Sequence, residues 1–226
     1  MKKHLLFLAL ATSSVSSFAL NFDSNVPAEV SAQMQDDLKF VASIQGNGTS
    51  ELNRDIFGAV DGPTYSDFFT SRVLSVGLWD CGGGGAVACV APYRDSSKMF
   101  VSNYYVKFDH PQIARVMVVF HESRHTENGN QNWMHARCPT PFNGKDGKPL
   151  VSIFTGLALA GKPGCDVTPF GSYGSSTIML KNIEKFCTNC SSKTKMDAGI
   201  YGDDQMNRII DADAHKEMEH DLYGAK

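Results

Sequence analysis

The sequence lacks the features that mark several large classes of protein. Its 21 Lys and Arg residues are balanced by 24 Asp and Glu residues, and the charges are interspersed along a chain of net charge −3. Because no basic stripe is present, we expect no nucleic-acid partner and no attachment to an anionic membrane. No internal repeat or long low-complexity tract divides the 226 residues, which are enough for one domain with a sizeable core.

Long hydrophobic runs are also missing, apart from a short one at the N-terminus. Residues 1–3 are basic, Leu5–Ala11 is apolar, and residues 17–19 have the small-x-small pattern of a cleavage site. This order is typical of a secretory signal peptide, which we place at residues 1–19, and the apolar run is too short to span a bilayer. No Cys follows it, which argues against a lipoprotein anchor. We expect a secreted or periplasmic chain from residue 20 to 226, with no transmembrane segment after cleavage.

Cysteine is present in an even number, and every Cys follows the predicted cleavage site. In an exported chain such a set indicates three disulfides rather than free thiols. The sequence cannot choose among the possible pairings, but we favour pairs of neighbours: Cys81 with Cys89, Cys138 with Cys165, and Cys187 with Cys190.

Apolar spacing predicts a mostly helical chain. Helices are expected at residues 26–44, 65–76, 111–127, 172–187 and 206–222, and a strand rich in β-branched and aromatic residues is expected at Met99–Phe108. The helix at 65–76 would bury a stripe of Phe68, Phe69, Val73 and Leu74. Asp109 would cap the helix at 111–127, with Pro111 in its first turn. Gly82–Gly85 lacks the Lys-Ser/Thr of a phosphate-binding loop and is better interpreted as a disulfide-tied turn.

The most informative motif is His121-Glu122-Ser123-Arg124-His125, an HExxH. On a helix, residues four apart lie one turn above each other, so both imidazoles can reach one ion. Glu122 is rotated by about 100° from His121 and can approach a water on that ion without binding it. Zinc with three protein ligands and one water is the usual catalytic arrangement, and Glu122 would then act as general base.

The motif and its context resemble the zincins, a superfamily of zinc peptidases that present an edge strand before an active-site helix. The resemblance covers about thirty residues and implies an α+β, zincin-like single domain, with the helix packed under a small mixed sheet and the whole stapled by disulfides. Zincins usually carry uncharged residues where this chain has Arg124. The longer metzincin motif is not met either, because Asn128 and Gln131 occupy its Gly and His positions.

A second resemblance is to small exported bacterial proteins of unassigned function that contain HExRHT. In this chain the matching residues are His121–Thr126, then His135 and Cys138, and the Gly-x-Tyr-Gly element at Gly171–Gly174. This resemblance implies a recurring design and names no substrate.

A third metal ligand is needed, and His135 is the first choice. It lies ten residues after His125, beyond an Asn-Gly turn, with Cys138 three residues further on as an anchor. Asp166 and Glu184 are the alternatives, since other zincin branches use a carboxylate. We also name Tyr173 as a candidate oxyanion stabiliser, although a packing role is equally open. Arg124 could pair with a carboxylate or bind a substrate terminus.

These residues predict a monomeric, exported Zn²⁺-dependent hydrolase acting on a peptide or protein, with Glu122 and Tyr173 as catalytic residues. The alternative is a non-catalytic exported zinc-binding or interaction protein, since function has to be argued from the site. The Cys187–Cys190 pair has CxxC spacing but would lie at a helix C-terminus, so we interpret it as structural. His215, Glu219 and His220 could bind a metal but more resemble a solvated face.

Overall fold

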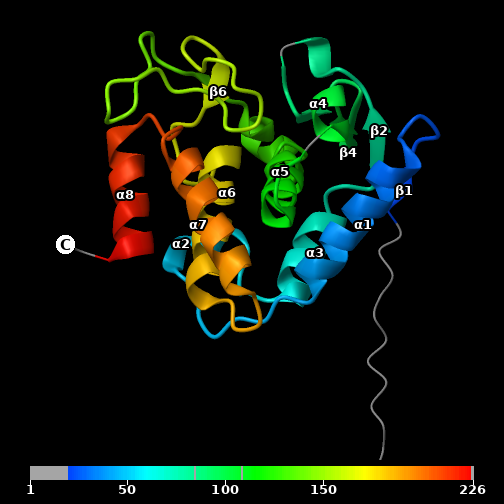
Figure 1. Cartoon of the computed structure of the whole chain (residues 1–226), viewed down its shortest axis with the longest axis horizontal. Coiled ribbons are helices and arrows are strands. Elements are labelled where there is room, and N and C mark those ends of the chain that lie inside the picture. The colour runs from blue at the N-terminus through cyan, green and yellow to red at the C-terminus, as the bar shows by residue number, and fades with distance from the viewer. Residues whose placement is uncertain (1–19, 84, 108, 225–226) are drawn as a thin grey trace, which may run out of the picture.

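A computed structural model describes residues 20–224 of the chain, except residues 84 and 108. The predicted signal peptide lies outside the described residues. The described chain is an α+β domain in which helices pack on both sides of a central helix, with a small mixed sheet at one side (Figure 1). The expected fold class, a mostly helical α+β single domain stapled by disulfides, is confirmed.

The helices differ greatly in length, and the longest contain fifteen residues. They are α1 (Ala28–Ala42), α2 (Glu51–Ile56), α3 (Gly62–Thr70), α4 (Asn103–Val106), α5 (Gln112–Arg124), α6 (Ser172–Phe186), α7 (Ser192–Met206) and α8 (Ala212–Tyr223), with 3₁₀ segments η1 (Cys81–Gly83) and η2 (Asn128–Trp133).

The main sheet has the strand order β1-β2-β4-β3. Its strands are β1 (Asn21–Phe22), β2 (Ser75–Leu78), β3 (Ala88–Ala91) and β4 (Asp95–Val101). The β1–β2 and β2–β4 pairs are parallel, whereas β3 pairs with β4 in antiparallel fashion, in the register Ala88 opposite Val101. β3 is therefore an edge strand. A separate two-stranded sheet joins β5 (Ala136–Arg137) to β6 (Pro163–Cys165).

α5 lies at the centre of the domain, between the main sheet and the α6–α7 pair (Figure 1). Its residues from Val116 to Arg124 are buried on every face, as expected for a helix that is apolar on more than one side. Phe120 lies among the rings of four other aromatic residues, with centroid distances of 5.8–6.2 Å: Phe57, Tyr65, Phe68 and Phe69. The last turns of α5 are thus fixed by packing, which matters because they carry the HExxH motif.

Two predicted helices have different bounds in the structure. Asp61 caps α3 by accepting a hydrogen bond from the backbone N–H of Thr64, so this helix begins before residue 65 and ends at Thr70. Residues 75–78 form β2 instead, and Leu74 is 56% exposed rather than part of the buried stripe. The helix with the site, expected at 111–127, extends from Gln112 to Arg124, because Pro111 is its N-cap and His125 its C-cap, and Asp109 does not cap it.

The predicted strand at 99–108 and the predicted last helix are each only partly right. β4 ends at Val101, after which the Ser102 hydroxyl accepts from the N–H of Tyr104 and starts α4. The apolar spacing at 206–222 runs across two helices, because Met206 ends α7 and Asp211 caps α8. Met206, Ala214, Met218 and Leu222 nonetheless share one buried cluster. The prediction missed α7 altogether, since its apolar residues are few and flanked by charges.

All three predicted disulfides are confirmed. Cys81 is bonded to Cys89, Cys138 to Cys165 and Cys187 to Cys190, and no free cysteine remains. The CxxC pair connects the end of α6 to the start of α7, which supports a structural role. Three disulfides indicate folding in an oxidising compartment.

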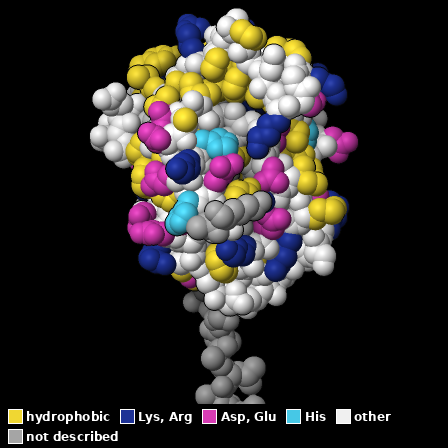
Figure 2. Space-filling view, turned by 90° about the vertical axis from the view of Figure 1, so that its left-hand side faces the viewer, with side chains coloured by type: hydrophobic (Ala, Val, Ile, Leu, Met, Phe, Trp, Pro, Cys, Tyr) yellow, Lys and Arg dark blue, Asp and Glu magenta, His cyan; other side chains and the backbone are white. Residues whose placement is uncertain are grey.

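The surface agrees with the interspersed charges of the sequence. On the side of the molecule formed by α8, acidic and basic side chains alternate, and hydrophobic side chains gather toward the top (Figure 2). Among the described helices, none has both the length and the apolar character needed to cross a membrane.

The aromatic cluster predicts a clear difference between two apolar substitutions. Phe120→Ala should lower the free energy of unfolding by about 3–5 kcal/mol, because it leaves a cavity among four rings. Leu74→Ala, at a side chain that is 56% exposed, should change it by less than about 0.5 kcal/mol. Urea unfolding followed by circular dichroism measures both values, and equal losses would contradict the described core.

Candidate metal centre

Three histidines converge at the C-terminal end of α5. His121 lies in the last turn of the helix, and His125 is its C-cap residue. The Nε2 atom of His135 lies 3.1 Å from Nε2 of His121 and 3.1 Å from Nε2 of His125. Imidazole nitrogens that bind one tetrahedral ion at about 2.1 Å stand about 3.4 Å apart, so the three atoms are arranged as a ligand set. Within the described residues this is the one group of three such side chains with donor atoms close enough to hold a metal.

A tight reversal of the chain brings His135 back to the helix. In η2, three successive non-glycine residues have positive φ angles: Gln131 at 52°, Asn132 at 56° and Trp133 at 46°. Such angles are uncommon outside glycine, although Asn tolerates them better than most residues. Asn132 contacts the helix end twice: its carbonyl accepts from Nδ1 of His125 at 2.7 Å, and its side-chain amide donates to the His125 carbonyl at 2.9 Å.

Asp166 holds His135 through Nδ1, the ring nitrogen that does not face the other two histidines. Its Oδ1 atom lies 2.8 Å from Nδ1 of His135, while its Oδ2 atom accepts from the backbone N–H groups of Tyr173 and Gly174 at 2.7 and 3.3 Å. The carboxylate therefore orients the imidazole and also satisfies the first turn of α6. Because Nδ1 donates to this carboxylate, Nε2 of His135 keeps its lone pair facing the other two histidines.

Of the three candidates for third ligand, the structure brings His135 to the pair. Asp166 is the partner of that histidine and is not part of the converging group. Glu184 instead forms an ion pair with Lys181 on α6. The choice of His135 over the two carboxylates therefore agrees with the geometry.

Burial keeps the two helix histidines uncharged. It lowers the pKa of His121 well below its usual range, and repulsion from any proton on the neighbouring rings of His135 and His125 lowers it further. Burial likewise lowers the pKa of His125 to about 4, with His135 adding to the effect. Neutral imidazoles are the form that binds a metal ion, so the site is prepared for one at neutral pH.

Glu122 is buried beside this group and is 5% exposed. Its Oε2 atom has no hydrogen-bond partner among the described residues, and burial raises the carboxyl pKa to about 8, against a smaller lowering by the backbone of Val90. Val90 lies on β3, so the carboxyl group faces the edge strand of the main sheet. An unpartnered buried carboxyl oxygen is costly and is typical of functional sites.

Tyr173 covers one side of the centre. Its ring centroid lies 4.4 Å from that of His121 and 4.5 Å from that of His135, against which it stacks. The Tyr173 hydroxyl accepts a hydrogen bond from Nη1 of Arg208 at 2.8 Å. The sequence located Tyr173 at the site, but it gave no sign of Arg208, which lies in a short connection after α7 without any motif.

Arg124 has a structural environment. Its guanidinium donates to the Phe170 carbonyl at 2.6 Å and to Glu127 at 2.6 Å, and it lies over the ring of Trp133. These contacts fit the carboxylate-pairing alternative. On α8, His215 and Glu219 are 3.7 Å apart and do not form part of a three-residue metal group among the described residues.

The hydrogen bond between Asp166 and His135 leads to a testable prediction. Asp166→Asn should weaken zinc binding about 10- to 100-fold, because the amide holds the imidazole less firmly and lacks the negative charge. Asp146→Asn, in an exposed loop, is the matched control and should leave the affinity unchanged. Competition with a chromophoric chelator measures both. An unaltered affinity in Asp166→Asn would contradict the role of this hydrogen bond.

Comparison with known proteins adds nothing to this geometry. No protein-family model, no curated protein and no solved structure matches the chain. The arrangement of these side chains is therefore the basis for inferring a function.

Proposed function

We propose that this chain is an exported zinc-dependent hydrolase, specifically a metallopeptidase. The observation that carries the proposal is the convergence of three histidine Nε2 atoms at 3.1 Å beside the buried carboxyl group of Glu122. This is the arrangement that the HExxH motif predicts when a third ligand is supplied from outside the helix.

The residues present fit Zn²⁺. Three imidazoles match the catalytic zinc sites that use three histidines and keep one position open. Two of them have their other ring nitrogen held, His125 by the Asn132 carbonyl and His135 by Asp166, as metal-binding histidines usually do. Imidazole sets also accept copper, nickel and iron, so the choice of zinc belongs to the proposal. A bound Zn²⁺ would supply a Lewis acid and a water of lowered pKa at neutral pH.

Glu122 is the proposed general base. Its neighbouring position on α5 turns it away from the ligand direction, and its Oε2 atom has no hydrogen-bond partner among the described residues. The charge of a bound cation would lower the raised pKa of this carboxyl group, so that the carboxylate could accept a proton from water and pass it to the leaving amine. The Tyr173 hydroxyl already accepts a hydrogen bond from Arg208, which leaves its own proton to donate to a developing oxyanion. The proposed substrate is a peptide or protein, and we expect the enzyme to act as a monomer.

Export is part of the proposal. The three disulfides favour an oxidising compartment, and the N-terminal pattern is that of a signal peptide, so we propose that the protein is secreted or periplasmic.

Burial favours one second candidate, a non-catalytic zinc-binding protein. His121 is 6% exposed and Glu122 is 5% exposed, so little of the centre faces solvent. Of the two pockets described on the surface, neither is lined by a histidine of the centre. In this candidate the zinc would stabilise the fold without turning over a substrate.

Two substitutions separate these functions. Glu122→Gln should keep zinc bound, because Glu122 is not a ligand, and should lower hydrolysis of unfolded casein by several orders of magnitude through loss of the proton transfer. His125→Ala should lose the metal and, with it, the rise in melting temperature that zinc gives the wild type. Metal analysis, calorimetry and a peptide-library assay measure these effects.

Wild-type protein that binds zinc but hydrolyses no peptide would favour the non-catalytic candidate. Equal hydrolysis by wild type and Glu122→Gln would show that the carboxyl group is not the base. A chain that binds no zinc would contradict both functions.

A further inference from the structure

Glu127, two residues after the second helix histidine, accepts four hydrogen bonds from side chains. Its Oε1 atom accepts from Nε of Arg72 at 2.9 Å and from Nη1 of Arg124 at 2.6 Å. Its Oε2 atom accepts from Nδ2 of Asn130 at 3.0 Å and from Nε1 of Trp133 at 2.7 Å. The carboxylate is therefore fully paired, with both charges of the two arginines directed at it.

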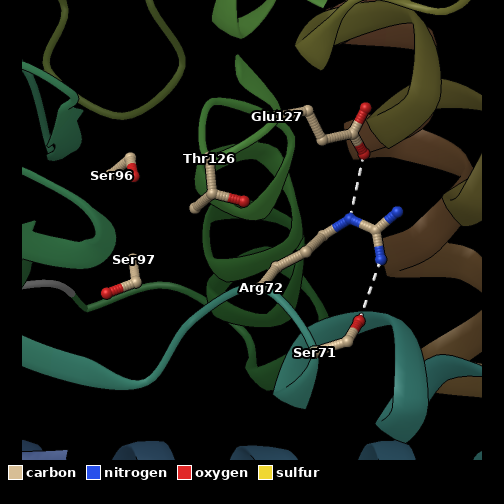
Figure 3. A pocket seen from close by; sticks show the side chains of 6 residues that line it. All are labelled: Ser71, Arg72, Ser96, Ser97, Thr126 and Glu127. Atoms are coloured by element: carbon tan, nitrogen blue, oxygen red, sulfur yellow. Dashed lines mark hydrogen bonds and ion pairs between the residues drawn. The ribbon is translucent and has the colours of Figure 1, made fainter. Parts of the chain in front are cut away.

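These four donors come from three different parts of the fold. Arg72 follows α3, and Figure 3 shows its side chain extended between Ser71 and Glu127. The Arg72 guanidinium also donates to the Phe68 carbonyl at 3.0 Å and lies over the ring of Phe68. Arg124 is the last residue of α5. The remaining two donors, Asn130 and Trp133, lie in η2. Glu127 thus joins η2 to two helices that are fixed in the core.

η2 is the segment that delivers two parts of the metal centre. It carries Asn132, whose carbonyl accepts from Nδ1 of His125, and it ends two residues before His135. Residues 131–133 all have positive φ, a conformation that non-glycine residues keep only when their surroundings enforce it. Asn130 and Trp133 flank the two central residues of that turn, so their bonds to Glu127 hold it from both ends.

We propose that Glu127 is a positioning residue of the metal centre. By gathering Asn130 and Trp133 against Arg72 and Arg124, it maintains the reversed turn and so places Nε2 of His135 against the two helix histidines. This inference rests on the metal site of the proposed function, but not on catalysis.

Glu127 lines a pocket, so it can be substituted without creating a cavity in the hydrophobic core. Glu127 and Arg72 line a pocket of about 410 Å³ that also includes Ser71, Ser96, Ser97 and Thr126, and the Glu127 side chain is 15% exposed (Figure 3). Glu127→Gln keeps the shape of the side chain but removes its charge and replaces one acceptor by a donor. Two of the four hydrogen bonds then lose their acceptor.

The experiment measures metal binding by the mature protein after removal of metal with a chelator. Glu127→Gln should bind Zn²⁺ about 10- to 100-fold more weakly in a chelator competition. Its Co²⁺ complex should show a changed d–d absorption spectrum, because the third imidazole is no longer held in place. A residue that only stabilises the fold would leave that spectrum unchanged.

Asp37→Asn is the matched control. Asp37 is buried, and its two carboxylate oxygens each lie 2.7 Å from the guanidinium of Arg115 on α5. This substitution should destabilise the fold but leave zinc affinity and the Co²⁺ spectrum as in the wild type. If Glu127→Gln does not fold, Trp133→Phe removes the indole N–H donor but keeps an aromatic ring beside Arg124, and it should weaken zinc binding about tenfold.

The outcomes are distinct. Wild-type affinity and spectrum in Glu127→Gln, or in Trp133→Phe where that variant is used, would overturn this inference and leave the proposed function standing. An effect of Asp37→Asn equal to that of Glu127→Gln would show a general loss of stability and would also overturn it. Absence of metal binding by the wild type would contradict the proposed function first, and this inference with it.

Discussion

The arrangement of the centre depends on one constraint: three imidazole nitrogens must meet with their lone pairs facing a common point. Two of them come from one helix at i and i+4, where the helix itself sets their spacing. The third must come from elsewhere, and here the chain reverses within the residues from 127 to 134. Hydrogen bonds to the other ring nitrogens of His125 and His135 then fix how each imidazole faces.

Several parts of the fold hold His135 in place after this reversal. The Cys138–Cys165 disulfide and the β5–β6 pair, in which Ala136 lies opposite Cys165, bring residue 135 and residue 166 together. Asp166 then connects His135 to the first turn of α6, where Tyr173 covers the histidines. A disulfide, a short sheet and a helix N-terminus thus converge on one imidazole, which explains how a residue in an irregular segment is held without being part of a helix or strand.

Burial of α5 has a chemical consequence. Because α5 is packed against the sheet on one side and against α6 on another, its polar residues are buried away from water together with its apolar ones. His121 and His125 are held neutral as a result, and Glu122 keeps an oxygen that has no hydrogen-bond partner within the described part of the chain. Packing that stabilises the core, such as the rings around Phe120, therefore also sets the protonation of the centre next to it.

The sequence by itself determined the local features: the helix that carries HExxH, the paired cysteines, and the polar turn after residue 127. These features follow from the spacing and type of residues that are close together in the sequence. It also named His135 among three candidates. Only the tertiary structure decided that Asp166 supports His135, that Arg208 holds Tyr173, and that Glu127 gathers four donors. Such contacts join residues that are far apart in the chain, or that meet only because the backbone reverses, so no local pattern encodes them. The error at 65–76 has the same reason, because Ser75 and Val76 pair with distant residues of β4. The error at 206–222 is instead local, because the Asp211 cap starts α8 within the apolar stripe.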